Sequence, residues 1–136
     1  MQLSPYLSFN GSCAEAMKFY QQVLGGEMVA MQTYAGTPAA EHVSLELRDK
    51  IIHARLVFGD NVLMAADEST ETFEPIKGIA VTLNIPDQAE AERVFHALSA
   101  GGSVTMPIEE TFWAVRFGML TDKFGTPWMI NCEKPM

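Results

Sequence analysis

The first clear pattern of apolar and polar positions lies between residues 12 and 26 and predicts a helix. Its apolar side chains recur at i, i+3, i+4 and i+7, so they share one helical face. Ser12 and Glu15 have the spacing of a capping box, which predicts that the helix begins there. Gly25 and Gly26 follow the last apolar position and predict the end of the helix. The apolar face carries Ala16, Phe19, Tyr20 and Val23.

Most other apolar positions alternate or run together over short stretches, which predicts strands. The turn residues GDN at 59–61 separate two such stretches and predict a hairpin. Residues 43–48, VSLELR, alternate with three apolar side chains on one side, so we expect a strand there as well. The expected strands span residues 3–9, 27–34, 43–48, 51–58, 62–67, 79–85, 103–108, 112–120 and 127–132.

The second half of the chain repeats the order of the first. Asp87 and Glu90 repeat the capping pattern, an apolar helical face follows, and a glycine pair at 101–102 ends the predicted helix. The triplet AEA at 14–16 recurs at 89–91, an offset of 75, and the first glycine pair recurs at an offset of 76. The second apolar face carries Ala91, Val94, Phe95 and Leu98.

This repeat predicts an α+β fold of two tandem βαβββ modules. The first module is expected over 1–67 and the second over 79–136, and the acidic, aperiodic stretch 68–78 is the predicted linker. Each half is too small to bury both faces of its sheet. We therefore expect one structural domain in which curved mixed sheets surround a concave pocket, with the helices outside.

Composition narrows the classes of partner. The formal net charge is -8, the pI is about 4.7 and the basic residues are scattered, which argues against nucleic acid or an anionic membrane as a partner. No apolar run approaches the roughly 18 residues of a membrane span, and the first ten residues lack the pattern of a signal peptide. We expect a cytoplasmic protein in which Cys13 and Cys132 are reduced thiols.

Three motifs carry a resemblance that covers nearly the whole chain. They are PYLSFNGSCAEAMKFY at 5–20, HARLVFGDNVLMAAD at 53–67 and FWAVRFGMLTDKFGTPWMINC at 112–132. With the βαβββ duplication they resemble the PhnB-like branch of the vicinal oxygen chelate superfamily, which includes glyoxalases and bleomycin-resistance proteins. Some members of this branch are called methyltransferases. The chain has no glycine-rich strand-to-helix loop of the kind that holds S-adenosylmethionine, so that activity is not expected.

The resemblance also implies where a metal would lie. Metal-using members place four ligands, usually His and Glu, at positions that correspond to about Pro5, Met64, Gly78 and Met129. None of these side chains is a His or carboxylate ligand. The sequence therefore predicts no metal ligands and no cofactor, with a divalent metal at a displaced site left open.

His53 and Arg55 share one face of their expected strand by its period of two, so they are predicted to face the pocket and bind an anionic or polar ligand. A cross-strand or solvent-facing pair is the alternative. Asp67 ends the next strand and is either a partner for these two, a base, or a turn-forming residue. His42, His53 and Asp67 form a possible displaced metal set, although their dispersal disfavours it.

The last hairpin is rich in large side chains. Trp113 and Trp128 either line a pocket or lie in the core or a dimer interface. Arg116 and Asn131 are its expected polar anchors, and Met64 and Met129 complete the predicted lining. The full set of predicted pocket residues is His53, Arg55, Met64, Asp67, Trp113, Arg116, Trp128, Met129 and Asn131.

Two functions follow from these expectations. The first is a small-molecule binding protein with a metal-free pocket, similar to the drug-binding resistance members. The second is an enzyme of the lyase, isomerase or dioxygenase kind with a displaced metal site. Related folds often complete their pockets across a two-fold axis, so we also expect a homodimer.

Overall fold

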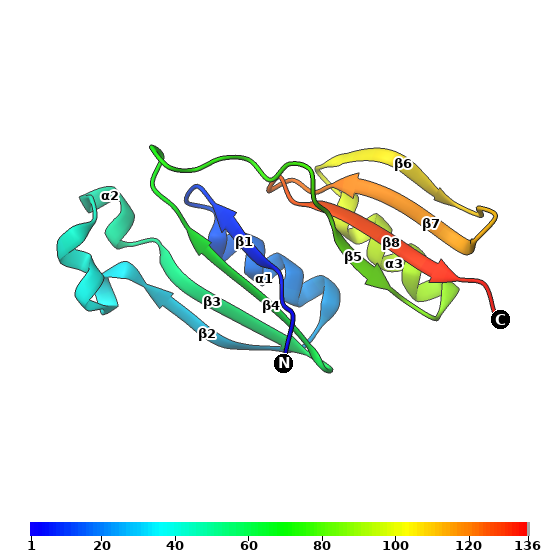
Figure 1. Cartoon of the computed structure of the whole chain (residues 1–136), viewed down its shortest axis with the longest axis horizontal. Helices are drawn as coiled ribbons and strands as arrows, with labels where there is room; N and C mark the ends of the chain where they lie inside the picture. Colours follow the sequence, from blue (N-terminus) through cyan, green and yellow to red (C-terminus); the bar gives the residue numbers. More distant parts are fainter. Residues whose placement is uncertain (136) are drawn as a thin grey trace. The chain divides into compact units, whose positions relative to one another are not determined.

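The computed structural model describes residues 1–135, and their contacts divide the chain into two compact units (Figure 1). Unit 1 spans Met1–Pro75, and unit 2 begins at Ile76. The division falls inside the stretch 68–78, and no helix or strand lies between Asp67 and Val81. That the two modules form one structural domain around a shared pocket stays a prediction.

Unit 1 is a four-stranded mixed sheet, here called sheet A, with one long helix on one face. Its strand order is β1-β4-β3-β2, in which β1 and β4 are parallel and the other neighbours are antiparallel. The face beneath α1 buries Ala54 and Leu56 from β3 and Leu63 and Ala65 from β4. The elements are β1 (Tyr6–Phe9), α1 (Cys13–Leu24), β2 (Glu27–Thr33), η1 (Tyr34–Gly36), η2 (Pro38–His42), α2 (Leu45–Arg48), β3 (Ile51–Phe58) and β4 (Asn61–Asp67).

Unit 2 repeats this architecture in sheet B, with the equivalent strand order β5-β8-β7-β6. Helix α3 covers the face that buries Leu120, Trp128 and Ile130. The predicted α+β fold of two βαβββ modules is therefore confirmed, each module with its helix on one face of a mixed sheet. The elements are β5 (Val81–Asn84), α3 (Gln88–Ser99), β6 (Ser103–Glu109), β7 (Ala114–Thr121) and β8 (Pro127–Glu133).

The two long helices begin in different ways. At α1 the capping-box prediction is wrong, because the Ser12 side chain makes no capping hydrogen bond. The carboxylate of Asp67, at the end of β4, instead accepts from the backbone N–H groups of Gly11 at 2.8 Å and Cys13 at 3.0 Å. An acceptor from a distant strand thus satisfies two backbone amides around the start of α1, and neither of them is the Glu15 amide that Ser12 was expected to serve.

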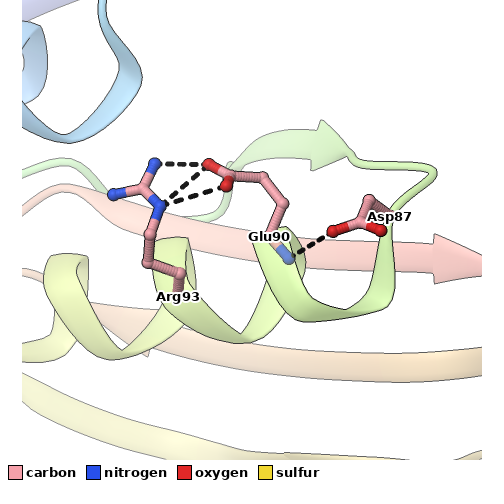
Figure 2. A network of polar contacts seen from close by, with 3 residues as sticks. All are labelled: Asp87, Glu90 and Arg93. Carbon is pink, nitrogen blue, oxygen red and sulfur yellow. Dashed lines mark hydrogen bonds and ion pairs between the residues drawn. The ribbon is translucent and has the colours of Figure 1, made fainter.

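At α3 the Asp87 part of the predicted capping box is confirmed (Figure 2). The Asp87 carboxylate accepts from the backbone N–H of Glu90 at 2.9 Å. The Glu90 carboxylate in turn accepts from Arg93 Nε at 3.0 Å, and this hydrogen bond lowers the pKa of Glu90. Both side chains of the ion pair are about half exposed, so solvent screens it and it contributes little to stability.

The predicted strand at 43–48 is wrong. Residues 34–50, which connect β2 to β3, form two 3-10 turns and the four-residue helix α2. Ser44 caps α2, since its side-chain oxygen accepts from the Leu47 N–H at 3.3 Å. Leu45 is 75% exposed while Leu47 is buried, so the alternation of apolar residues does not correspond to one buried face. Ser44 thus caps a short helix at residues where the period-two pattern had predicted a strand.

No helix within residues 1–135 is long and apolar enough to cross a bilayer.

Candidate functional site

The face of sheet A opposite α1 gathers polar and sulfur-bearing side chains. Strand alternation and register place them together: Tyr6 lies beside Met64, Met64 beside Arg55, and Gln32 beside His53. We call this surface the A face. It is formed by Tyr6, Ser8, Gln32, His53, Arg55 and Met64.

Arg55 is the cation of the A face. Its Nη1 lies 4.0 Å from the Met64 sulfur, a weak contact, and no carboxylate lies within ion-pair distance of its guanidinium among residues 1–135. The His53 ring lies roughly parallel to the Tyr6 ring, with centroids 6.1 Å apart. Burial raises the pKa of Tyr6, so its hydroxyl is neutral and able to donate near pH 7. The face therefore offers hydrogen-bond donors and a positive charge.

Asp67 lies on the other face of sheet A. Its side chain is 1% exposed, and its carboxylate accepts from the backbone N–H groups of Gly11, Cys13 and Ile51. The Tyr34 hydroxyl donates to its backbone carbonyl at 2.7 Å. The structure therefore does not bring Asp67 to Arg55 or His53, because its oxygens join the starts of α1 and β3 to the end of β4.

In sheet B the face opposite α3 is apolar, with a pair of amides at one end. Cross-strand register places Met129 between Thr82 and Met119, and Asn131 between Asn84 and Phe117. We call this surface the B face, formed by Thr82, Asn84, Phe117, Met119, Met129 and Asn131. The Trp113 ring, 43% exposed, packs edge-on against Phe117 with centroids 5.2 Å apart.

Asn131 carries an unsatisfied polar atom. Its Nδ2 donates to Asn84 Oδ1 at 3.0 Å, while its Oδ1 is buried and has no hydrogen-bond partner within residues 1–135. Buried polar atoms without partners are uncommon in folded proteins and need an explanation. Asn131 is therefore the B-face residue with unused hydrogen-bonding capacity.

Two predicted pocket residues lie on the α3 side instead. Trp128 is 1% exposed, and its indole N–H donates to the Asp122 carboxylate at 2.8 Å. Arg116 donates from Nε to Glu92 Oε1 on α3 at 2.7 Å. Arg116 shares the α3 side of β7 with Gly118 and Leu120, so strand alternation separates it from the B face. Trp128 and Arg116 thus do not join Met129 and Asn131 in the arrangement that the sequence suggested.

The positions at which relatives hold metal ligands carry different donors. Pro5 and Gly78 lie outside the strands, and the residues beside Met64 and Met129 are Tyr6 and Thr82. Thioethers and neutral hydroxyls do not fit a centre built from His and carboxylate ligands. Within residues 1–135, no three His, Cys, Asp or Glu side chains lie close enough together to form a metal-binding group. The structure therefore does not bring His42, His53 and Asp67 together as a metal site.

Sequence reasoning missed a polar hollow beside the segment 34–50. A cavity of about 510 Å³ lies between this segment and residues 68–72, and its lining includes Tyr34, His42 and Glu46. A second hollow of about 420 Å³ lies next to it, beside Asn10 and Lys50. The sequence could have indicated these hollows by one feature. The connection between β2 and β3 is long, whereas the equivalent connection between β6 and β7 is short.

Comparison with known proteins gives the family. Residues 1–131 match the model of the family described as 3-demethylubiquinone-9 3-methyltransferase. Protein YjdN of Escherichia coli is 36% identical, and the match covers 98% of this chain and 97% of the relative. Protein PA1353 of Pseudomonas aeruginosa, a crystal structure, is 49% identical with a TM-score of 0.91 and covers 99% of both chains.

More distant structures share the fold alone. A PhnB protein from Bacillus cereus is 24% identical with a TM-score of 0.80, over 97% of this chain and 99% of its own. A glyoxylase/bleomycin resistance protein/dioxygenase domain from Frankia is 11% identical with a TM-score of 0.68, over 98% of this chain and 92% of its own. The chain therefore belongs to the family described as 3-demethylubiquinone-9 3-methyltransferase.

Proposed function

We propose that this protein binds a small molecule with an anionic group, and that Arg55 on the A face holds that group. The observation that carries the proposal is a partly buried guanidinium with no carboxylate partner among residues 1–135. Neighbouring His53 and the neutral Tyr6 hydroxyl add donors on the same face. A guanidinium with free N–H groups matches the two oxygens of a carboxylate or phosphate.

The chemistry of the A face favours binding over burial of a structural ion pair. The chain has 17 Asp and Glu residues and only 9 Lys and Arg residues, so carboxylates that could pair with a partly buried arginine are in excess. Arg116 illustrates this, because Glu92 pairs with it directly. Arg55 instead lies among Met64, His53 and Tyr6, where an incoming anion would meet a positive charge already partly removed from water.

A methyl-transfer function does not fit the residues of this chain. S-adenosylmethionine carries a carboxylate, a sulfonium and an adenosine, which binding sites hold with free backbone amides and an acid at a strand-to-helix turn. Two backbone amides of the turn before α1 are already held by the Asp67 carboxylate, and the Asp87 carboxylate before α3 is already held by the Glu90 N–H. We therefore propose no methyl transfer. We favour metal-free binding over a displaced metal site, because the side chains of Met64, Met129, Tyr6 and Thr82 offer thioethers and neutral hydroxyls in place of His and carboxylate ligands.

Calorimetric titration with 2-naphthoate and its neutral analogue 2-naphthamide tests the proposal. Arg55→Met removes the cation and keeps an unbranched apolar chain in place of the Arg methylene groups. Arg116→Met is the matched control, because Arg116 lies on the α3 side and pairs with Glu92. We expect Arg55→Met to weaken naphthoate binding by roughly 10- to 100-fold, as for loss of a charged hydrogen bond. Naphthamide binding should change by about twofold or less.

Equal weakening in both arginine variants would contradict the role of Arg55. Failure of a panel of aromatic carboxylates, phosphates and phosphonates to bind the wild-type protein would contradict the proposal as a whole. Since ligand binding stabilises the folded state, the same panel can be screened by thermal shift before calorimetry.

A further inference from the structure

We propose that Asn131 is a ligand-orienting residue of the B face, and that it takes the N–H or O–H donor of a flat, largely apolar molecule. The juxtaposition behind this proposal is a buried, unpaired amide oxygen at the edge of a surface of sulfur and aromatic side chains. The inference rests on the proposed small-molecule function but uses a different unit, different residues and a different ligand group.

An unpaired polar atom remains buried at this position in either orientation of the Asn131 amide. As the structure has it, Asn131 Nδ2 donates to Asn84 Oδ1 and leaves Asn131 Oδ1 buried without a donor. Turning both amides over would reverse their hydrogen bond and put Asn131 Nδ2 in the same buried place, again without a partner. Asn84 therefore satisfies one end of the Asn131 amide, and no group within residues 1–135 satisfies the other end.

Leaving this oxygen unpaired is unfavourable. A buried acceptor without a donor loses its hydrogen bonds to water and gains none in return. An apolar side chain of similar size, such as Leu, would avoid this loss, and Met129, the preceding residue of β8 on the same face, shows that this face accommodates apolar side chains. A polar residue at this place is therefore best explained by a ligand that completes its hydrogen bonds.

The surroundings of Asn131 define the rest of the ligand. Phe117 lies directly across from it on β7, and Trp113 packs edge-on against Phe117. Met129 and Met119 form the next cross-strand pair on the same face. Aromatic edges and flexible thioethers favour a flat, polarisable ring system, since both make close contacts with π surfaces. None of these side chains is charged, so the ring need carry no charge here.

Indole and 1-methylindole are a matched pair of probes for this site. They share a flat apolar ring system, and only indole has an N–H to donate. Binding is measured by NMR titration of the full chain. Asn131→Leu removes the acceptor, and Asn61→Leu is the control, because Asn61 lies in the β3–β4 hairpin of unit 1 and its amide donates to the Phe58 carbonyl. All three proteins are tested with both probes.

We expect the wild type and the Asn61→Leu control to prefer indole over 1-methylindole by roughly tenfold, the effect of one neutral hydrogen bond. Asn131→Leu should bind both probes equally, and its unliganded form should unfold at no lower denaturant concentration than the wild type. Equal binding of both probes by the wild type would overturn the proposal, as a bound water would then satisfy Asn131. Failure of both probes to bind would also overturn it.

A second measurement needs no variant. When indole binds the wild type, the side-chain amide signals of Asn131 should shift and show a nuclear Overhauser effect from the indole N–H. The same signals should not respond in this way to 1-methylindole. Shifts confined to other residues would overturn the assignment. The two proposals can fail separately, because indole is neutral. If Arg55→Met bound naphthoate as tightly as the wild type, the proposed function would be overturned, but the indole result at Asn131 would still stand.

Discussion

Removing the Asp67 carboxylate is expected to destabilise unit 1 far more than removing any surface acid. The carboxylate is buried and accepts three backbone hydrogen bonds, from Gly11 at 2.8 Å, Cys13 at 3.0 Å and Ile51 at 2.9 Å. These amides belong to the start of α1 and the start of β3. Asp67→Ala leaves all three N–H groups without their acceptor.

The size of the effect follows from the number of amides. A buried donor left unsatisfied costs about 1–3 kcal/mol, and water that enters the space vacated by the carboxylate recovers part of this. The net loss in the free energy of unfolding is therefore about 3–5 kcal/mol, a large share of the roughly 5–15 kcal/mol of a small domain. Asp87→Ala is the matched comparison. Its carboxylate accepts one hydrogen bond at an exposed helix cap, so the expected loss is about 1 kcal/mol.

Urea unfolding followed by far-UV circular dichroism measures both losses. Asp67→Asn provides a readable intermediate if Asp67→Ala does not fold, because its amide keeps one oxygen acceptor but places an NH₂ group against at least one backbone donor. We expect the order of stability to be wild type, Asp87→Ala, Asp67→Asn and Asp67→Ala. A loss in Asp67→Ala no greater than that in Asp87→Ala would refute the view that this carboxylate holds the unit together.

Three further predictions follow from the buried contacts. Burial, reinforced by a nearby carboxylate, raises the pKa of the Cys13 thiol to about 12, so Cys13 should resist Ellman's reagent at pH 8 in the folded protein and react after denaturation; rapid native labelling would contradict this. Trp128→Phe removes the donor to the buried Asp122 carboxylate and should lower the free energy of unfolding by about 2–3 kcal/mol in a urea titration, whereas a neutral result would show that this hydrogen bond is dispensable. Gly118→Ala should cost about 1–3 kcal/mol by the same assay, since an added Cβ would lie 2.5 Å from the Phe95 ring; unchanged stability would mean that α3 can shift freely.

The fold could be predicted because its signals are local and repeated. The apolar helical faces of α1 and α3, the glycines after them and the alternation in β3 each reflect a short-range rule. The position at which α1 begins was predicted correctly, but the hydrogen bonds around its start were not, because their acceptor is Asp67, 54 residues from Cys13 in the chain. No pattern around Ser12 indicates that a distant strand will supply the cap.

Part of the candidate site could also be predicted from the sequence, and part required the structure. Period-two alternation correctly grouped His53 with Arg55, and Met129 with Asn131, on the faces opposite the helices. The same alternation places Arg116 with Gly118 and Leu120 on the α3 side of β7, so the prediction that Arg116 joins Asn131 as a polar anchor was wrong against that pattern. The unpaired oxygen of Asn131 also required the structure, since it depends on which atoms surround the amide.

NMR of the arginine Nε–H groups during titration of the wild-type protein with 2-naphthoate is the most direct test of the proposed function. Arg55 and Arg116 are internal references for one another, because both are partly buried but within residues 1–135 only Arg116 has a carboxylate partner, Glu92. If the A face binds the anion, the Arg55 signal should shift in a saturable manner while the Arg116 signal stays in place. A shift of Arg116 alone, or no shift of Arg55 at saturating naphthoate, would contradict the account.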